Sequence, residues 1–248
     1  AIDFWEGEGS GLPSPEGVKY SVVIFCTRFA RRLQHVLLSL VHQVGVESKE
    51  LEIIVGYVPG ADTTDDTIDS FRLLYPEVRI QRVPFPRTNM RSKGLVINQC
   101  CAGAAGEWVL LLDSDILLPP NMIGRIEAAP DEMVFMCPEG RRMLDPNQTA
   151  RVLLSDLRPW EDWDTLMAKA TVDKSGEAEG IPIGYCQIVR RSCLDEVQYT
   201  EYEHFEGADS DFALAIRERY GNEHRMDGVS VLHLDHGGSQ WYGTDKQR

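Results

Sequence analysis

The feature that most constrains the fold is an alternation, within the first 113 residues, of short apolar segments with segments of helical character. The apolar, strand-like segments cover residues 20–26, 51–58 and 78–83, and a fourth runs from Trp108 to Asp113. Between them, helical spacing or helix-start signals cover residues 33–44, 62–74 and 90–105. Strands that alternate with helices predict βαβ units with right-handed crossovers. We therefore expect an α/β fold with a mostly parallel central sheet flanked by helices.

Beyond Pro120 the alternation becomes less regular. Further strands are expected over residues 133–137, 181–190 and 229–234, and helices over 192–197 and 209–220. The charged segment 139–179 is interpreted as an irregular insertion or a partly mobile surface segment. No internal repeat is found.

Composition narrows the class of protein. The chain of 248 residues is 43% apolar, enough for one large α/β domain or two small ones. Its net charge of −14 argues against a nucleic acid or an anionic membrane as partner. Six cysteines without metal-site spacing favour reduced thiols and a cytoplasmic location, with any membrane association peripheral, through another domain or partner.

No segment has the roughly 20 consecutive apolar residues of a transmembrane helix. Residues 1–19 are acidic and rich in Gly and Pro at their start, which is typical of a flexible leader or a linker. A linker would be consistent with the loss of a neighbouring domain.

Asp113 and Asp115 follow the fourth apolar segment, one residue apart, and Pro119 and Pro120 end the run. Residues two apart at a strand end point the same way, so both carboxylates can converge on one cation while Ser114 points elsewhere. Ligands of open α/β sheets bind at this edge, and carboxylates suit a divalent cation that carries a diphosphate. An Asp-rich turn is the alternative interpretation.

Asp209 and Asp211 stand at the start of the helix expected over 209–220. Helix signals alone favour a capping role for Asp209, because Asp accepts backbone N–H bonds at a helix start and Arg217 and Arg219 complement the other end. A catalytic base at Asp209 is compatible with such a cap.

His236 falls just past the last expected strand, before two glycines that let the backbone bend. Its imidazole can turn toward the sheet edge, whereas His233 is expected to face a different direction. Two aspartates and one imidazole suit Mn²⁺ well and Mg²⁺ less naturally.

Two clusters of basic residues interrupt the acidic chain, namely Arg28, Arg31 and Arg32, and Arg87, Arg91 and Lys93. Each is expected at a sheet edge, where Arg can hold phosphate or carboxylate, although surface solvation is the alternative and is the interpretation given to Arg32. The absence of GxxxxGK[ST], GxGxxG and GxSxG argues against P-loop enzymes, dinucleotide dehydrogenases and serine hydrolases.

Taken in order, these motifs resemble a family-two glycosyltransferase of the GT-A fold, over roughly residues 20–237. The most specific part is Arg91-Ser-Lys-Gly-Leu-Val-Ile-Asn98 followed by Ala105-Gly-Glu-Trp-Val-Leu-Leu-Leu-Asp-Ser-Asp115, which is similar to the family's helix and DXD strand. Gly207-Ala-Asp209-Ser-Asp211 resembles its base-bearing motif, and Leu232-His-Leu-Asp-His236 its late histidine motif. The segments at residues 20–28, 51–55 and 180–192 resemble its first strand, second strand and acceptor-side segment.

The resemblance implies a Rossmann-like catalytic domain over 20–248, with a nucleotide-sugar half over 20–118 and an acceptor half over 119–248. It implies a metal-dependent hexosyl- or N-acetylhexosaminyltransferase of polysaccharide biosynthesis. The enzyme would move a sugar with inversion from a nucleotide-diphosphate sugar, expected to be a UDP-sugar, to a hydroxyl of a glycan or similar acceptor.

The resemblance also implies roles for individual residues. Asp209 is the expected base, and Asp113, Asp115 and His236 are the expected ligands of Mn²⁺ or Mg²⁺. The expected acceptor contacts are Gly184 and Asp211, and the expected donor contacts are Thr27, Arg28, Tyr57, Arg91, Asp113 and Ser114.

Two departures from the family pattern stand out. Gly56-Tyr-Val-Pro-Gly-Ala-Asp62 replaces the usual Asp-rich turn that recognises the nucleobase, and Ala208 replaces the Glu beside the base, a role that Asp211 is expected to take in part. A retaining GT-A transferase and a silent binding module remain alternatives, while the lack of a Gly-rich phosphate loop disfavours a nucleotidyltransferase. Two roles are open for the aromatic residues, stacking on a sugar or simple packing, and these residues are Trp160, Trp163, Trp241 and Tyr242.

Overall fold

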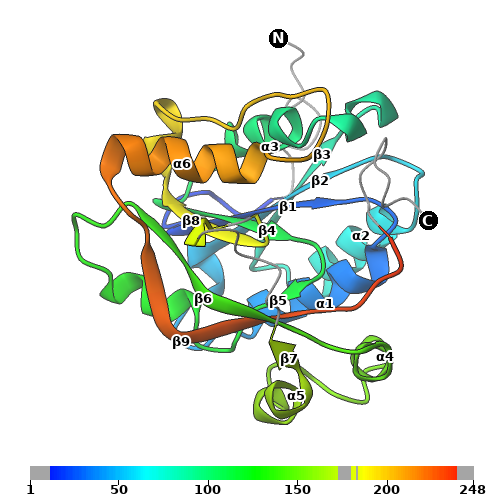
Figure 1. The fold of residues 1–248 in the computed structure, drawn as a ribbon. Helices are drawn as coiled ribbons and strands as arrows, with labels where there is room; N and C mark the ends of the chain where they lie inside the picture. Colours follow the sequence, from blue (N-terminus) through cyan, green and yellow to red (C-terminus); the bar gives the residue numbers. More distant parts are fainter. Residues whose placement is uncertain (1–11, 173–179, 183, 239–248) are drawn as a thin grey trace.

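The computed structural model describes residues 12–172, 180–182 and 184–238. Its centre is a nine-stranded sheet in which eight strands follow the order β3-β2-β1-β4-β8-β6-β9-β5 and β7 pairs with β6 (Figure 1). The strands are β1 (Tyr20–Cys26), β2 (Leu51–Tyr57), β3 (Arg79–Pro84), β4 (Trp108–Asp113), β5 (Ile116–Leu117), β6 (Phe135–Met143), β7 (Thr171–Val172), β8 (Cys186–Arg190) and β9 (His224–His233).

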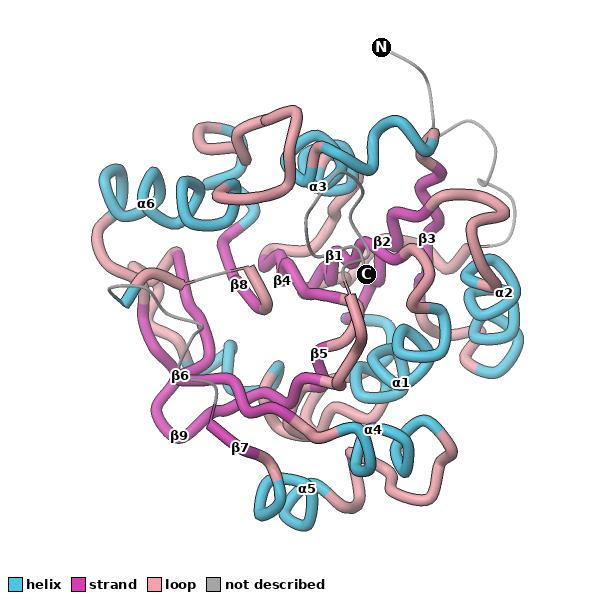
Figure 2. The backbone as a smooth tube through the Cα atoms, turned by 45° about the vertical axis from the view of Figure 1, so that its right-hand side comes forward, coloured by secondary structure: helices cyan, strands magenta, loops and turns pink. Residues whose placement is uncertain are grey.

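Helices cover both faces of the sheet (Figures 1 and 2). The α-helices are α1 (Ala30–Val41), α2 (Thr64–Leu74), α3 (Lys93–Cys101), α4 (Pro146–Leu153), α5 (Trp163–Lys169) and α6 (Ala208–Tyr220). Short 3₁₀ turns occur at η1 (Ser48–Glu50), η2 (Arg87–Arg91), η3 (Ile123–Ala128) and η5 (Arg191–Asp195). In Figure 1, α3 and α6 lie above the sheet, and α1, α2, α4 and α5 lie below it.

The four strands β3, β2, β1 and β4 pair in parallel, as the βα alternation predicts. Strand β8 then pairs antiparallel with β4 and with β6, whereas β6 and β9 are parallel to each other. The α/β fold with a mostly parallel, helix-flanked sheet is confirmed. The carboxyl ends of β1–β4 therefore share one edge of the sheet.

Two hydrophobic cores sandwich the sheet, because successive residues of a strand point to opposite faces. In β1, Val22 and Ile24 pack into one core, while Val23 and Phe25 pack into the other. Both cores are built from fully buried side chains of strands and helices. This burial on both faces explains why β1, β2 and β4 appear in the sequence as continuous apolar segments.

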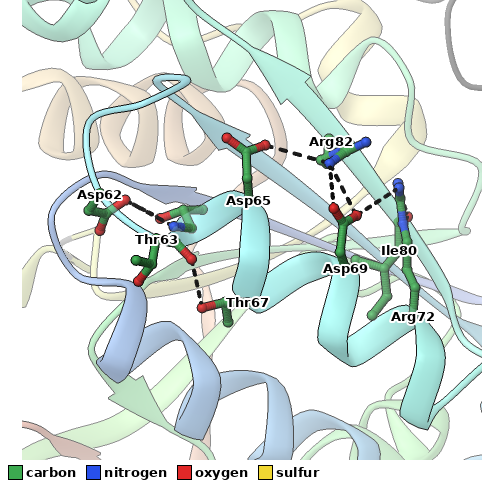
Figure 3. A network of polar contacts seen from close by, with 9 residues as sticks. Asp62, Thr63, Asp65, Thr67, Asp69, Arg72, Ile80 and Arg82 are labelled. Atoms are coloured by element: carbon green, nitrogen blue, oxygen red, sulfur yellow. Dashed lines mark hydrogen bonds and ion pairs between the residues drawn. The ribbon is translucent and has the colours of Figure 1, made fainter.

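Ion pairs tie α2 to the edge strand β3 (Figure 3). The Arg82 guanidinium on β3 lies 3.1 Å from Asp69 and 3.5 Å from Asp65, both on α2, and Arg72 donates to the carbonyl of Ile80. Partly exposed ion pairs add little to stability, so the main effect of these pairs is to fix the position of α2 against β3.

The segment 139–179 is more ordered than expected wherever the structure describes it. It continues β6 to Met143 and adds α4, α5 and β7. A start signal for α4 lies in the sequence, since Asp145 accepts a 2.7 Å hydrogen bond from the Gln148 amide and Pro146 occupies the first helical position. The prediction of an irregular segment is therefore wrong for this part.

Several boundaries also differ from the prediction. The helix expected over 90–105 is a 3₁₀ turn followed by α3, because the extended backbone of Ser92 separates them and its side chain caps Leu95. Strand β8 is shorter than 181–190, while β9 is longer than 229–234. No helix within the described residues is long and apolar enough to cross a membrane. The leader over 1–19 and the two halves of the domain stay predictions.

Candidate functional site

A group of potential metal ligands lies where β4 and β9 end. Asp115, His233 and His236 each offer a ligand atom within 4.8 Å of the others. The Nε2 atom of His236 lies 3.1 Å from Asp115 Oδ2, and Nε2 of His233 lies 3.6 Å from the same oxygen. The prediction that His233 faces elsewhere is wrong, because pairing of β5 with β9 sets His233 opposite Ile116, next to Asp115.

The donor atoms fit a divalent transition metal. One carboxylate and two imidazoles make a mixed oxygen and nitrogen set. The Nδ1 atoms of His233 and His236 are buried and have no hydrogen-bond partner in the described part of the chain. Buried polar atoms are normally paired, so these two histidines are typical of a site completed by a further group.

The turn that carries His236 is fixed by backbone contacts. The Leu234 amide donates to the Asp115 carbonyl at 2.9 Å, and the Asp235 amide donates to the Thr149 hydroxyl at 2.9 Å. The Arg32 guanidinium on α1 donates to the Asp235 carbonyl. Arg32 is therefore not a solvated surface residue as interpreted from the sequence, but holds the histidine turn in place.

The pKa values of Asp113 and Asp115 are shifted in opposite directions. Burial raises the pKa of Asp113 to about 6, and the carboxylates of Asp115 and Asp209 add to the effect of burial while Lys93 opposes it. Burial acts the same way on Asp115, but the hydrogen bond from His236 and the positive potential of His233 hold the pKa of Asp115 below its usual range. Asp115 is thus the better anionic ligand.

Lys93 links this pair to the predicted base. Its ammonium, at the start of α3, lies 2.8 Å from Asp209 and 3.5 Å from Asp113. The side chain is only 8% exposed, and although burial disfavours the charge, the two carboxylates raise the pKa of Lys93 above its usual value. The Asp209 side chain is 22% exposed but its Oδ1 atom is buried, so the carboxylate is only partly accessible, and its cationic partner is buried. Sequence reasoning placed Lys93 in a basic cluster and missed this contact.

Two further contacts position Asp209. The Gln187 side chain on β8 donates to the Asp209 carbonyl at 3.1 Å. Gly184 lies so close that a Cβ atom there would be 2.1 Å from Asp209 Cγ. Only a residue without a side chain allows this approach, which places the predicted acceptor residue Gly184 against the predicted base.

The neighbours of Asp209 on α6 have separate partners. Gly207 occupies the N-cap position in a left-handed conformation, and Asp209 makes its side-chain contacts to Lys93. Ala208 is fully buried in a hydrophobic core. Asp211 accepts a 2.5 Å hydrogen bond from the Tyr202 hydroxyl. The residue that orients Asp209 here is therefore Lys93, where the sequence suggested Asp211.

A hollow of about 710 Å³ lies at the carboxyl ends of β1–β3. It is lined by Arg28, Phe85, Arg87 and the turn after β2. Asp62 in that turn accepts hydrogen bonds from the Ala30 amide and from the Thr64 amide and hydroxyl. Its carboxylate thereby joins the loops after β1 and β2 that border the hollow. This edge is the usual ligand position in open α/β sheets.

The remaining predicted donor residues lie in two places. Thr27, Tyr57 and Ser114 are buried at the ends of their strands. Arg91 is exposed and lines a different hollow, of about 410 Å³, with Glu201 and Tyr202. The structure thus brings Asp113, Asp115, His236 and Asp209 together and places Arg91 elsewhere. Trp241 and Tyr242 lie outside the described residues.

The family model described as "Glycosyltransferase like family 2" matches residues 15–226. The chain belongs to this family. Its expected GT-A fold is confirmed by solved structures of similar architecture. No curated protein matches the chain.

Three solved structures illustrate the likeness. The mannosyltransferase PcManGT from Pyrobaculum calidifontis, in complex with GDP-Man and Mn²⁺, is 18% identical with a TM-score of 0.64, over 91% of this chain and 59% of that one. TarS 1-349 from S. aureus with UDP-GlcNAc is 16% identical with a TM-score of 0.68, over 92% and 61%. Glucosyl-3-phosphoglycerate synthase from Mycobacterium tuberculosis, with Mn²⁺, UDP and glucosyl-3-phosphoglycerate, is 17% identical with a TM-score of 0.52, over 89% and 73%. The chain thus spans about three fifths of the length of the first two.

Proposed function

We propose that this family member is a metal-dependent glycosyltransferase that moves a sugar from a nucleotide-diphosphate sugar to a hydroxyl group of a glycan acceptor, with inversion. The observation that carries the proposal is the chain of contacts from Asp113 through Lys93 to Asp209, beside the group of Asp115, His233 and His236. It sets a partly accessible carboxylate next to a metal-ligand group at the ligand-binding edge of the sheet.

Asp115, His233 and His236 would hold the metal, for which we propose Mn²⁺. A bound divalent cation neutralises charge on a leaving nucleoside diphosphate. The similar structures that contain Mn²⁺ together with GDP-Man or UDP support this choice. The hollow beside Arg28 and Arg87 is the proposed nucleotide site, with UDP-sugars as the first donors to test.

Asp209 would remove the proton from the acceptor hydroxyl as its oxygen attacks the sugar. The Lys93 ammonium pairs with the Asp209 carboxylate, which lies in the space that a Cβ atom at Gly184 would occupy. Lys93 also pairs with Asp113, so a change of charge at one aspartate alters the electrostatic potential at the other.

The test is Asp209→Asn, which we expect to lower turnover by about 10²–10⁴-fold while metal and nucleotide still bind. Glu206→Gln, an exposed neighbour, serves as the matched control. Wild-type turnover in Asp209→Asn would refute the assignment of the base. Product NMR tests inversion, since an unchanged anomeric configuration would instead indicate a retaining enzyme.

The fully buried Ala208 favours one other candidate function, a binding module that holds a nucleotide sugar without turnover. Slow Mn²⁺-dependent hydrolysis of a donor would exclude it, because hydrolysis requires an intact catalytic group.

A further inference from the structure

A second hollow, of about 430 Å³, is lined by two tryptophans as well as polar side chains. Trp160 and Trp163 line it together with Asn121, Glu161 and Asp164, and Pro119 and Pro120 form part of its wall. Both tryptophans, Glu161 and Asp164 precede or begin α5, which lies on the side of the sheet opposite α3 and α6 (Figure 1). The metal-ligand group and Asp209 are not among the described residues that line it.

The aromatic part of the hollow is held rigidly. The Trp160 ring stacks on His42, with centroids 4.3 Å apart and an angle of 14° between the rings. The His42 imidazole is fixed in turn, since its Nδ1 lies 2.8 Å from the Leu38 carbonyl. Because His42 covers one face of the indole, a ligand can reach only the rest of the ring. Trp163 packs partly against the hydrophobic core.

The same end of α1 also anchors the proline wall. The Val44 amide donates to the Pro120 carbonyl at 2.6 Å, and the Gln43 side chain donates to the Pro119 carbonyl at 2.9 Å. Fixed walls of this kind reduce the entropy lost when a ligand binds. The hollow is therefore a preformed site.

The polar groups of the hollow include two without a partner. The side chains of Asn121 and Asp164 make no hydrogen bond or ion pair within the described part of the chain, while the Glu161 carboxylate is paired with Arg158 at 3.1 Å. An amide and a carboxylate beside two indoles offer hydrogen bonds to hydroxyl groups and a flat apolar surface to C–H groups. The two carboxylates outnumber Arg125, the one cation among the described residues that line this hollow, and this excess disfavours anionic ligands.

We propose that this hollow binds a neutral saccharide unit of a glycan, with a sugar face on the tryptophans and its hydroxyls on Asn121 and Asp164. Ser230, which also lines the hollow, lies three residues before His233 on β9, about 10 Å at the rise of an extended strand. Because the two residues are three apart on one strand, their side chains point to opposite faces, and the hollow is a site separate from the site of transfer. Saccharide binding there needs neither donor nor metal and does not rest on the proposed function.

Saturation-transfer NMR on the whole chain, without nucleotide or metal, tests the proposal. The probes are cellotetraose, maltotetraose, mannotetraose and chitotetraose. We expect at least one of these saccharides to bind. Trp160→Ala should weaken the affinity for that saccharide about tenfold or more, because the variant lacks one stacking surface. Asp209→Asn should bind the same probe as the wild type, which separates this site from the proposed base.

Trp160→Ala loses its stack on His42 and can destabilise the fold, so the double variant Asn121→Ala, Asp164→Ala provides a second test at exposed positions. It should also weaken binding, whereas the exposed control Glu77→Ala should not. The proposal is overturned if none of the four probes binds, or if binding survives in the double variant. It is equally overturned if a proline-rich peptide displaces the saccharide and binds more tightly, since aromatic grooves also accept such peptides.

Discussion

Lys93 is the residue on which the site's electrostatics depend most, because its buried ammonium neutralises two carboxylates at once. We expect Lys93→Met to lower kcat about 100-fold, since Asp209 would lose the buried cation that pairs with it and orients it. Lys93→Arg should recover part of the loss. Both variants remove native packing, so thermal unfolding is measured beside kcat. Equal kcat losses in both variants, in proportion to their destabilisation, would indicate a purely structural role.

Gly184 packs directly against the Asp209 carboxylate, so a side chain at this position should disturb the site. In Gly184→Ala the new methyl group would overlap the Asp209 carboxylate, so this carboxylate must move. We expect kcat to fall at least about tenfold with little change in nucleotide affinity, because small displacements of a reacting group are costly. Gly140→Ala is the matched control, since its Cβ would meet only the Ser230 hydroxyl, at 3.7 Å. Normal kcat in Gly184→Ala would contradict the position assigned to the base.

Some residues of this site were predictable from sequence and others were not. Asp115, His236 and Asp209 stand in motifs whose spacing points to their positions. His233 was misjudged because the pairing of β9 with β5 depends on a long-range register that strand periodicity does not encode. Lys93 contacts Asp209 across 116 residues of sequence, and only its place in a basic cluster marked it out beforehand.

At the scale of elements, one buried carboxylate joins β1, β2, β3 and the turn before β4. Glu52 is fully buried, accepts hydrogen bonds from Ser21 and from the Ala105 amide at 2.5 Å each, and lies 3.3 Å from Arg79. We expect Glu52→Gln to lower the free energy of unfolding by about 3 kcal/mol, because it removes the anion and turns an NH₂ group toward donors. Urea unfolding measures the change, with the exposed Glu77→Gln as control.

The network around Glu52 lies near the amino ends of the strands, away from Asp113. Folded Glu52→Gln should therefore retain its affinity for metal and nucleotide. A variant that unfolds at the wild-type urea concentration would show that the network does not stabilise the sheet.

The elements themselves were predictable to different degrees. The βα units up to β4 follow from continuous apolar segments, because strands buried on both faces leave a clear signal. Helices α4 and α5 were missed because they have only 8 and 7 residues, shorter than the sequence window over which a helical period is recognised. The capping residue Asp145 and the following Pro146 were the available signals.

For the whole molecule, the metal-ligand group connects distant parts of one sheet. Asp115 follows β4, whereas His233 and His236 come from the end of β9, three places further along the sheet order. A ligand that binds only this folded arrangement shifts the unfolding equilibrium by mass action. Metal binding should therefore stabilise the whole sheet, and its effect is measurable without knowledge of donor or acceptor.

We expect saturating Mn²⁺ to raise the thermal midpoint by about 5–10 °C, which is the shift that about 2.7 kcal/mol produces in a chain of this size. Chelation should reverse the shift, and Mg²⁺ should produce a smaller one because it binds imidazole less readily. His233→Ala should lose the shift, while His224→Ala, an exposed histidine at the other end of β9, should keep it. If His233→Ala shows an equal shift, His233 is not a metal ligand, and Asp113 is the expected third ligand beside Asp115 and His236.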